Sequence, residues 1–141
     1  MKKILCAVIA LAMFATVCMS QAAFAENYVE VDRTDRNIAY LDMDSIKDAG
    51  DYITAVTKIT LRSPEERAKL KERAGVEAHY ILMDVAYDKA ARRDQPLGVR
   101  LVYGYEVTGA ESRDFSEENW REIPKGTVGA IIYDKLMNVV K

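Results

Sequence analysis

Cysteine is nearly absent from this sequence. The 141 residues contain two, Cys6 and Cys18, and both lie close to the N-terminus. If the chain is cut after Ala25, the remaining part has no thiol. Such a part has no disulfide, no cysteine nucleophile and no zinc–thiolate site, so its stability must come from packing.

Histidine is scarcer still, because His79 is the only one. A Ser-His-acid triad or a metal site would depend on it alone, and no residue near it has ligand spacing. The chain has no G-x-S-x-G, phosphate-loop or S-x-x-K motif, and no spacing selects a carboxylate pair for glycoside hydrolysis. We therefore expect a protein that is not an enzyme, with no catalytic, cofactor-binding or metal-binding residues. We interpret His79 as a side chain at the edge of a strand.

The N-terminal residues have the organisation of a secretory signal peptide. Met1-Lys2-Lys3 is positively charged, residues 4–19 are apolar and uncharged, and Ala23-Phe24-Ala25 fits a small-x-small cleavage site. The apolar run is too short to favour a transmembrane anchor. We divide the chain into a signal peptide, residues 1–25, and one exported domain, residues 26–141, located in the periplasm or on the bacterial cell surface.

Lipidation of Cys18 is the alternative to simple cleavage. A lipoprotein signal has a small residue just before the cysteine and a leucine-like residue three before it. The chain has Val17 and Ala15 at these positions. We therefore favour cleavage after Ala25.

The exported part lacks an excess of basic charge. The chain has 20 basic and 22 acidic side chains, and loss of Lys2 and Lys3 reduces the basic ones to 18. The resulting net charge of −4 argues against a nucleic-acid binder, which would need an uncompensated basic surface. The net charge neither favours nor excludes binding to another protein.

Most of the exported part has the patterns of β-strands. Alternating or β-branched residues predict strands over residues 27–32, 37–42, 52–61, 77–87 and 99–108. The first two form a hairpin, and the fourth, apolar on both faces, is an interior strand. Residues 43–51, 88–96 and 109–119 are predicted as connections.

Two helices are predicted. Ser63-Pro64-Glu65-Glu66 is a capping box that starts a charged, solvent-exposed helix ending at Ala74, before Gly75. A second helix follows the N-cap Thr127. Its projection places Val128, Ile131, Ile132, Leu136, Val139 and Val140 on one arc, with Ala130, Asp134 and Asn138 opposite. We predict an α+β fold: an antiparallel sheet of about five or six strands covered by the C-terminal amphipathic helix, with the charged helix inserted between strands.

Three groups of side chains are candidates for binding, and each has a structural explanation. Asp42, Asp44, Asp48 and Asp51 lack the spacing of a calcium loop, so we favour turn-forming roles. Residues 89–93 with Arg100 are basic and could contact an acidic polysaccharide or a host protein, but we favour a solvated hairpin end. The tyrosines, Tyr80, Tyr87, Tyr103 and Tyr105, are predicted to form cross-strand packing pairs.

Two short motifs resemble those of the surface-adhesin protein E family. The first is Tyr40-Leu41-Asp42 followed by Ser45-Ile46 and Gly50, and the second is Trp120 to Pro124 with Gly126 and Thr127. The resemblance spans nearly all of residues 27–140. It implies a small exported domain of a sheet and a helix that is able to form a homodimer. Many members carry two cysteines that this chain lacks, so packing alone must hold the closing helix here.

The resemblance also supplies the functional expectation. The protein for which the family is named binds host extracellular-matrix and plasma proteins at the bacterial surface. We therefore expect an exported binding module, with a periplasmic accessory domain that binds another envelope protein as the alternative. The motif residues, Tyr40, Asp42, Ser45, Ile46 and Trp120, are turn or packing types, and we assign none of them to a ligand.

Overall fold

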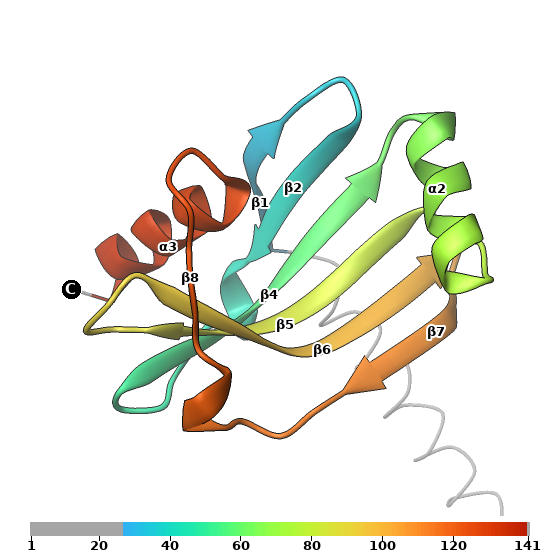
Figure 1. Ribbon diagram of the computed structural model, residues 1–141. Coiled ribbons are helices and arrows are strands. Elements are labelled where there is room, and N and C mark those ends of the chain that lie inside the picture. Colours follow the sequence, from blue (N-terminus) through green and yellow to red (C-terminus); the bar gives the residue numbers. More distant parts are fainter. Residues whose placement is uncertain (1–26, 141) are drawn as a thin grey trace, which may run out of the picture.

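The computed structural model of the protein describes residues 27–140, so the predicted signal peptide and Cys18 lie outside the described residues. Within this range the fold is α+β, an open antiparallel sheet of eight strands with two α-helices (Figure 1). The strands are β1 (Tyr28–Arg33), β2 (Asn37–Asp42), β3 (Lys47–Asp48), β4 (Tyr52–Leu61), β5 (Tyr80–Asp88), β6 (Arg93–Tyr103), β7 (Glu106–Ser112) and β8 (Arg121–Glu122). The helices are α2 (Pro64–Ala74) and α3 (Val128–Val139), and the short 3-10 helices are η1 (Met43–Ser45) and η2 (Glu117–Asn119).

The predicted fold class is confirmed. Six strands form the main sheet in the order β1-β2-β4-β5-β6-β7, and each is antiparallel to its neighbours. The two-residue strands β3 and β8 pair with β4 and β6. The predicted hairpin is formed by β1 and β2, and β5 is the predicted interior strand, between β4 and β6.

The face of the sheet under α3 forms the core. Alternate residues of β4 and β5 share this face, because Ile53 lies opposite Tyr87 and Ala55 opposite Val85. All four side chains are buried. They pack in one cluster with Leu41 of β2, Ile123 and four residues of α3, namely Ala130, Ile132, Tyr133 and Leu136.

The helix α3 begins at the predicted N-cap, but its buried face differs from the prediction. Thr127 Oγ1 accepts a hydrogen bond from the Ala130 N–H at 3.3 Å. Ala130 and Tyr133 are buried, whereas Ile131 is 42% exposed and Val139 is 48% exposed. The prediction that Ala130 points away from the core is wrong. The predicted arc contains aliphatic residues alone, whereas the helix is rotated so that the large ring of Tyr133 is buried.

The helix α2 matches its prediction. Ser63 Oγ accepts from the Glu65 N–H at 3.2 Å, and Gly75, with a φ of +75°, ends the helix. None of its residues is buried. Figure 1 shows α2 and α3 at opposite ends of the sheet.

The predicted connections after β5 need two corrections. Residues 88–96 were predicted as a loop, yet β6 begins at Arg93. Pro96 is tolerated in this strand because the register between β5 and β6 shifts beside it, and a bulge accommodates a residue that cannot donate. Residues 99–108 were predicted as one strand and 109–119 as irregular, but the chain turns at Gly104 and continues as β7 to Ser112.

Candidate functional site: the hairpin of β6 and β7

The turn between β6 and β7 displays apolar side chains to solvent. Gly104 has a φ of +62°, a backbone conformation that other residues rarely adopt, so the chain reverses within two residues. Tyr105 follows it and is fully exposed. Tyr103 is 45% exposed and Val107 is 57% exposed. Three large apolar side chains therefore project from one hairpin end.

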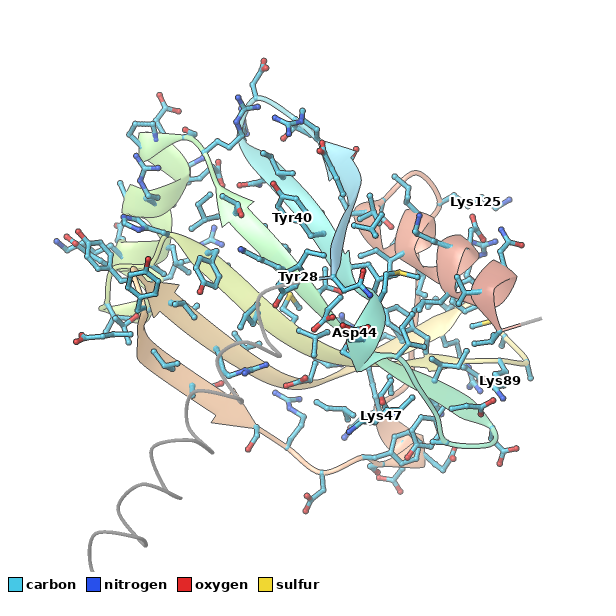
Figure 2. The ribbon with its side chains drawn as sticks, turned by 180° about the vertical axis from the view of Figure 1, so that it is seen from behind. Tyr28, Tyr40, Asp44, Lys47, Lys89 and Lys125 are labelled. Carbon is cyan, nitrogen blue, oxygen red and sulfur yellow. The ribbon has the colours of Figure 1, made fainter. Side chains whose placement is uncertain are left out.

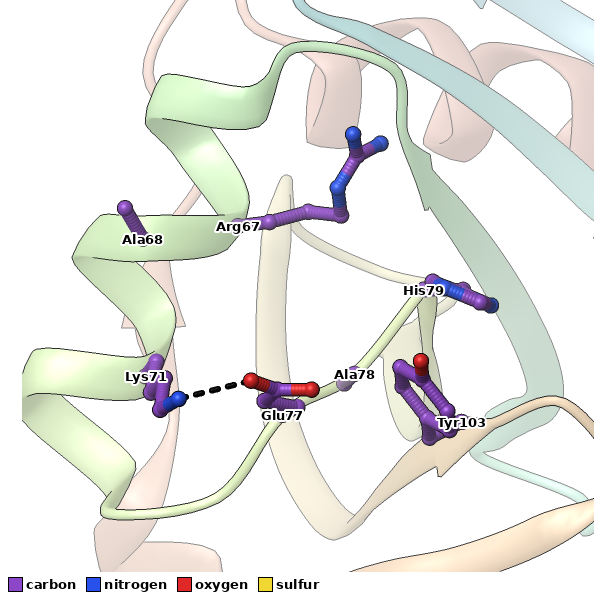
Figure 3. Close-up of a pocket in the computed structure, with 7 residues that line it drawn as sticks. All are labelled: Arg67, Ala68, Lys71, Glu77, Ala78, His79 and Tyr103. Carbon is purple, nitrogen blue, oxygen red and sulfur yellow. Dashed lines mark hydrogen bonds and ion pairs between the residues drawn. The ribbon is translucent and has the colours of Figure 1, made fainter.

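A cavity of about 310 Å³ lies beside this hairpin, facing α2 (Figure 3). Its walls are formed by Arg67, Ala68 and Lys71 of α2, by residues 77–79 before β5, and by Tyr103. The rings of His79 and Tyr103 lie side by side, with centroids 4.2 Å apart. The interpretation of His79 as a strand-edge residue therefore omits its place in a cavity wall.

Hydrogen bonds hold the cavity walls in position. The His79 N–H donates to the Val102 carbonyl oxygen at 2.8 Å, which places His79 beside the end of β6. Thr108 Oγ1 donates to the Glu77 carbonyl oxygen at 2.8 Å and so ties the segment before β5 to β7. Across the cavity, Arg67 Nη1 donates to the Leu61 carbonyl oxygen at 3.0 Å.

The charges in the cavity are largely balanced. Lys71 Nζ lies 2.6 Å from Glu77 Oε1 (Figure 3), and this hydrogen bond lowers the pKa of Glu77 and raises the pKa of Lys71. Arg67 adds a positive charge. The cavity thus offers aromatic faces, a guanidinium group and an imidazole, which suit a polar or aromatic side chain of a partner.

The opposite face of the sheet carries a second aromatic group. Lys58 Nζ lies over the rings of Tyr28, Tyr40 and Tyr80, at 5.1, 5.8 and 4.4 Å from their centroids. Figure 2 shows Tyr28 and Tyr40 close together on β1 and β2. Burial, followed by the nearby Asp42, raises the pKa of Tyr28. These tyrosines already surround a cation of the domain itself, which makes them packing residues.

The tyrosines do not all behave as predicted. Tyr87 is buried and Tyr80 packs against Lys58, as expected of cross-strand packing. Tyr105, however, is fully exposed at the turn. The prediction missed it because Tyr103, Gly104 and Tyr105 were placed inside one strand. The isolated glycine between two aromatic residues was the available signal for a turn.

The acidic connection has the predicted turn-forming role. Asp42 Oδ1 accepts from the Asp44 N–H at 3.1 Å, and Asp48 Oδ1 accepts from the Gly50 N–H at 2.9 Å. Asp44 accepts from Asn27 Nδ2 at 2.8 Å. Among residues 27–140, no group of three or more His, Cys, Asp or Glu side chains is placed to hold a metal ion.

The basic residues after β5 are paired with carboxylates. The pairs are Lys89–Asp48 at 2.6 Å, Arg92–Asp134 at 2.9 Å, Arg93–Asp88, and Arg100–Asp84 at 3.9 Å. Arg92 also lies over the ring of Tyr133, and Arg93 over that of Trp120. Because a carboxylate accompanies each cation, the segment does not form the uncompensated basic surface that an acidic polysaccharide would need.

The residues of the first family motif make structural contacts. Ser45 Oγ donates to the Asp42 carbonyl oxygen and accepts from the Val56 N–H, both at 2.7 Å, and so links η1 to β4. Leu41 is fully buried in the core. Gly50 has a φ of +99°, which favours glycine at this turn.

The residues of the second family motif also make structural contacts. Trp120 packs edge-to-face against Tyr52 and Phe115, with centroids 6.2 and 5.4 Å away. Its indole N–H donates to Glu117 Oε2 at 3.0 Å. Thr127 Oγ1 donates to the Pro124 carbonyl oxygen at 2.7 Å as α3 begins. These contacts agree with the architectural roles assigned from the sequence.

Comparisons of the chain with protein-family models, with curated proteins and with solved structures found no match. The relation to the surface-adhesin protein E family therefore stays a prediction from the two motifs. In the part of the chain that the structure describes, no helix has the length and apolar character needed to cross a membrane.

Proposed function

We propose that residues 26–141 form an exported, non-enzymatic protein-binding module, similar to surface-adhesin protein E, that acts as an adhesin for host extracellular-matrix or plasma proteins. The observation that carries this proposal is the hairpin of β6 and β7, with its exposed Tyr103, Tyr105 and Val107, of which Tyr103 also lines the cavity.

The composition of this hairpin supports protein binding. Tyrosine is enriched among the residues that dominate binding energy in protein interfaces, because its ring buries a large area at a small cost in conformational entropy. A side chain as exposed as Tyr105 contributes little to folding. The adjacent cavity can receive a side chain from the partner, as central interface pockets do.

The binding claim is tested with immobilised vitronectin, laminin and plasminogen. The purified domain, residues 26–141, is passed over each protein in a surface-plasmon-resonance experiment. We expect saturable binding to at least one of them at micromolar concentrations or below. The absence of saturable binding to all three at micromolar protein would contradict the adhesin proposal.

The location is tested by proteolysis of intact cells that carry the full chain with a C-terminal epitope tag. An adhesin on the surface is removed by added protease, whereas a periplasmic domain is spared until the outer membrane is opened. Loss of the tag from intact cells supports the proposal. Protection of the tag, with a periplasmic marker also intact, would favour the accessory domain that binds another envelope protein.

A further inference from the structure

The two edges of the sheet differ in how they are protected. At one edge, the register between β1 and β2 shifts between Glu30 and Asp32, and α3 contacts β1. A bulge and a covering helix both hinder the addition of another strand. At the other edge lies β7 (Figure 1), and no strand within residues 27–140 pairs with its outer side.

The backbone of β7 pairs regularly with β6 from Gly109 to Ser112, so its outer side is a regular strand edge. The one irregularity in its pairing with β6 falls at Thr108, close to the turn. The Arg113 N–H donates to the Leu97 carbonyl oxygen at 2.8 Å, so Arg113 points its backbone groups at β6. Because backbone direction alternates along an antiparallel strand, Ala110 and Ser112 point theirs outward. Both residues are exposed.

A small pocket lies beside this edge. It has a volume of about 70 Å³ and is formed by residues 96–99 of β6 and residues 111–113. The bulge at Leu97 opens it, because the register between β5 and β6 shifts there. A water molecule takes ~30 Å³ in the liquid, so this volume accepts a small aliphatic side chain. Strand addition commonly combines such a pocket with backbone hydrogen bonds.

The charge along β7 indicates the chemistry of the partner. The only charged side chains of β7 are two carboxylates, Glu106 and Glu111, and one basic residue, Arg113, follows the strand. Edge strands are often protected by lysine or proline, and β7 has neither. Carboxylates on an open edge repel an acidic strand and attract a basic one.

We propose that the outer edge of β7, from Gly109 to Ser112, binds an extended basic segment of a partner protein as an additional strand of the sheet. The backbone groups of Ala110 and Ser112 supply the hydrogen bonds. Glu106 and Glu111 select lysine or arginine, and the pocket beside Leu97 receives a small aliphatic side chain. This inference rests on the proposed protein-binding function and names the chemistry of the partner.

The test uses two synthetic peptides, one of alternating valine and lysine and one of alternating valine and glutamate. Each is titrated into the isotope-labelled domain, residues 26–141, and followed by amide NMR. We expect the lysine peptide to bind saturably and to shift the amide signals of Ala110 and Ser112. The glutamate peptide should leave these signals unchanged.

Two substitutions locate the binding. Ala110→Pro removes an outward N–H without removing a bond to β6, so it should fold and weaken peptide binding by roughly tenfold. Glu111→Lys should also weaken it, while Glu72→Lys, an equal charge change on the exposed surface of α2, should not. Full affinity in both Ala110→Pro and Glu111→Lys would overturn the proposal, as would shifts confined to residues away from β7.

Other outcomes also overturn the proposal. Equal affinity for the lysine and glutamate peptides would show that the carboxylates of Glu106 and Glu111 do not select a basic segment. A dimer that forms with rising protein concentration and is lost in Ala110→Pro would identify a second copy of the chain as the occupant. If Ala110→Pro keeps wild-type affinity for a matrix protein while hairpin variants lose it, the edge proposal fails and the adhesin proposal stands.

Discussion

The phenolic oxygen of Tyr133 on α3 lies 3.0 Å from the carbonyl oxygen of Asp88 at the end of β5. The same hydroxyl lies 3.2 Å from the carbonyl oxygen of Ala91. The C-terminal helix is therefore fastened to the connection between β5 and β6 by one buried hydroxyl, in a domain whose described residues include no cysteine.

Replacement of Tyr133 by phenylalanine should lower the free energy of unfolding by ~1 kcal/mol. The ring stays in the core, but the carbonyl oxygen of Asp88 loses a donor. Thermal unfolding followed by circular dichroism measures the change. Tyr103→Phe is the control, because Tyr103 is 45% exposed and should unfold like the wild type. Equal stability of Tyr133→Phe and the wild type would show that the hydroxyl does not fasten the helix.

The orientation of α3 predicts that aspartate substitutions at neighbouring residues differ in their effect on stability. Ile132→Asp or Leu136→Asp should unfold the domain, because an unpaired buried charge costs several kcal/mol against a typical total of ~5–15 kcal/mol. Ile131→Asp should be tolerated, because Ile131 is 42% exposed. Urea unfolding of the three variants measures this. A folded Leu136→Asp would contradict the burial of this helix, and an unfolded Ile131→Asp would contradict its observed rotation.

This contrast shows what the sequence could and could not predict for α3. The N-cap Thr127 and the apolar periodicity predicted the helix and its place over the sheet. The periodicity did not predict the buried face, because Ile131, Val139 and Tyr133 compete for it. Tyr133 packs in the core, and Asp88, 45 residues away in sequence, supplies the acceptor that its buried hydroxyl needs. The local periodicity of the sequence cannot predict a contact between residues so far apart.

The carboxylate of Asp88 predicts a loss of stability in acid. Burial opposes its ionisation, but hydrogen bonds from the Ala90 N–H and from Arg93 outweigh this, so the pKa of Asp88 lies below its ordinary value. A lowered pKa stabilises the folded state above the ordinary pKa of ~3.9, and this contribution is lost as the pH falls through the folded pKa.

The measurement is the melting temperature of the wild type and of Asp88→Asn across this pH range. At neutral pH the wild type should be more stable, because asparagine is neutral and cannot form an ion pair with Arg93. The difference should shrink as the pH falls below about 4, because Asp88 becomes protonated in the unfolded chain before it does in the folded one. A difference that stays constant down to pH ~2 would show that the ionised carboxylate makes no contribution.

The candidate site was less predictable than the core. The β-branched residues within 52–61 predicted β4 correctly, because strand propensity is a local property of the sequence. The hairpin was missed because residues 99–108 alternate, and only Gly104 indicates the turn. The cavity depends on the packing of α2 against residues 77–79 and Tyr103, which no local pattern specifies. Long-range geometry thus decides where the exposed tyrosines lie.

The most direct test of the proposed function compares the hairpin with an exposed apolar residue elsewhere on the domain. The double variant Tyr103→Ser/Tyr105→Ser and the control Ile131→Ser are passed over the immobilised matrix or plasma protein that binds the wild type. Both variants should melt as the wild type does, within a few degrees. We expect the double variant to lose at least roughly tenfold in affinity, and Ile131→Ser to bind normally. Wild-type affinity in the double variant would contradict binding through this hairpin.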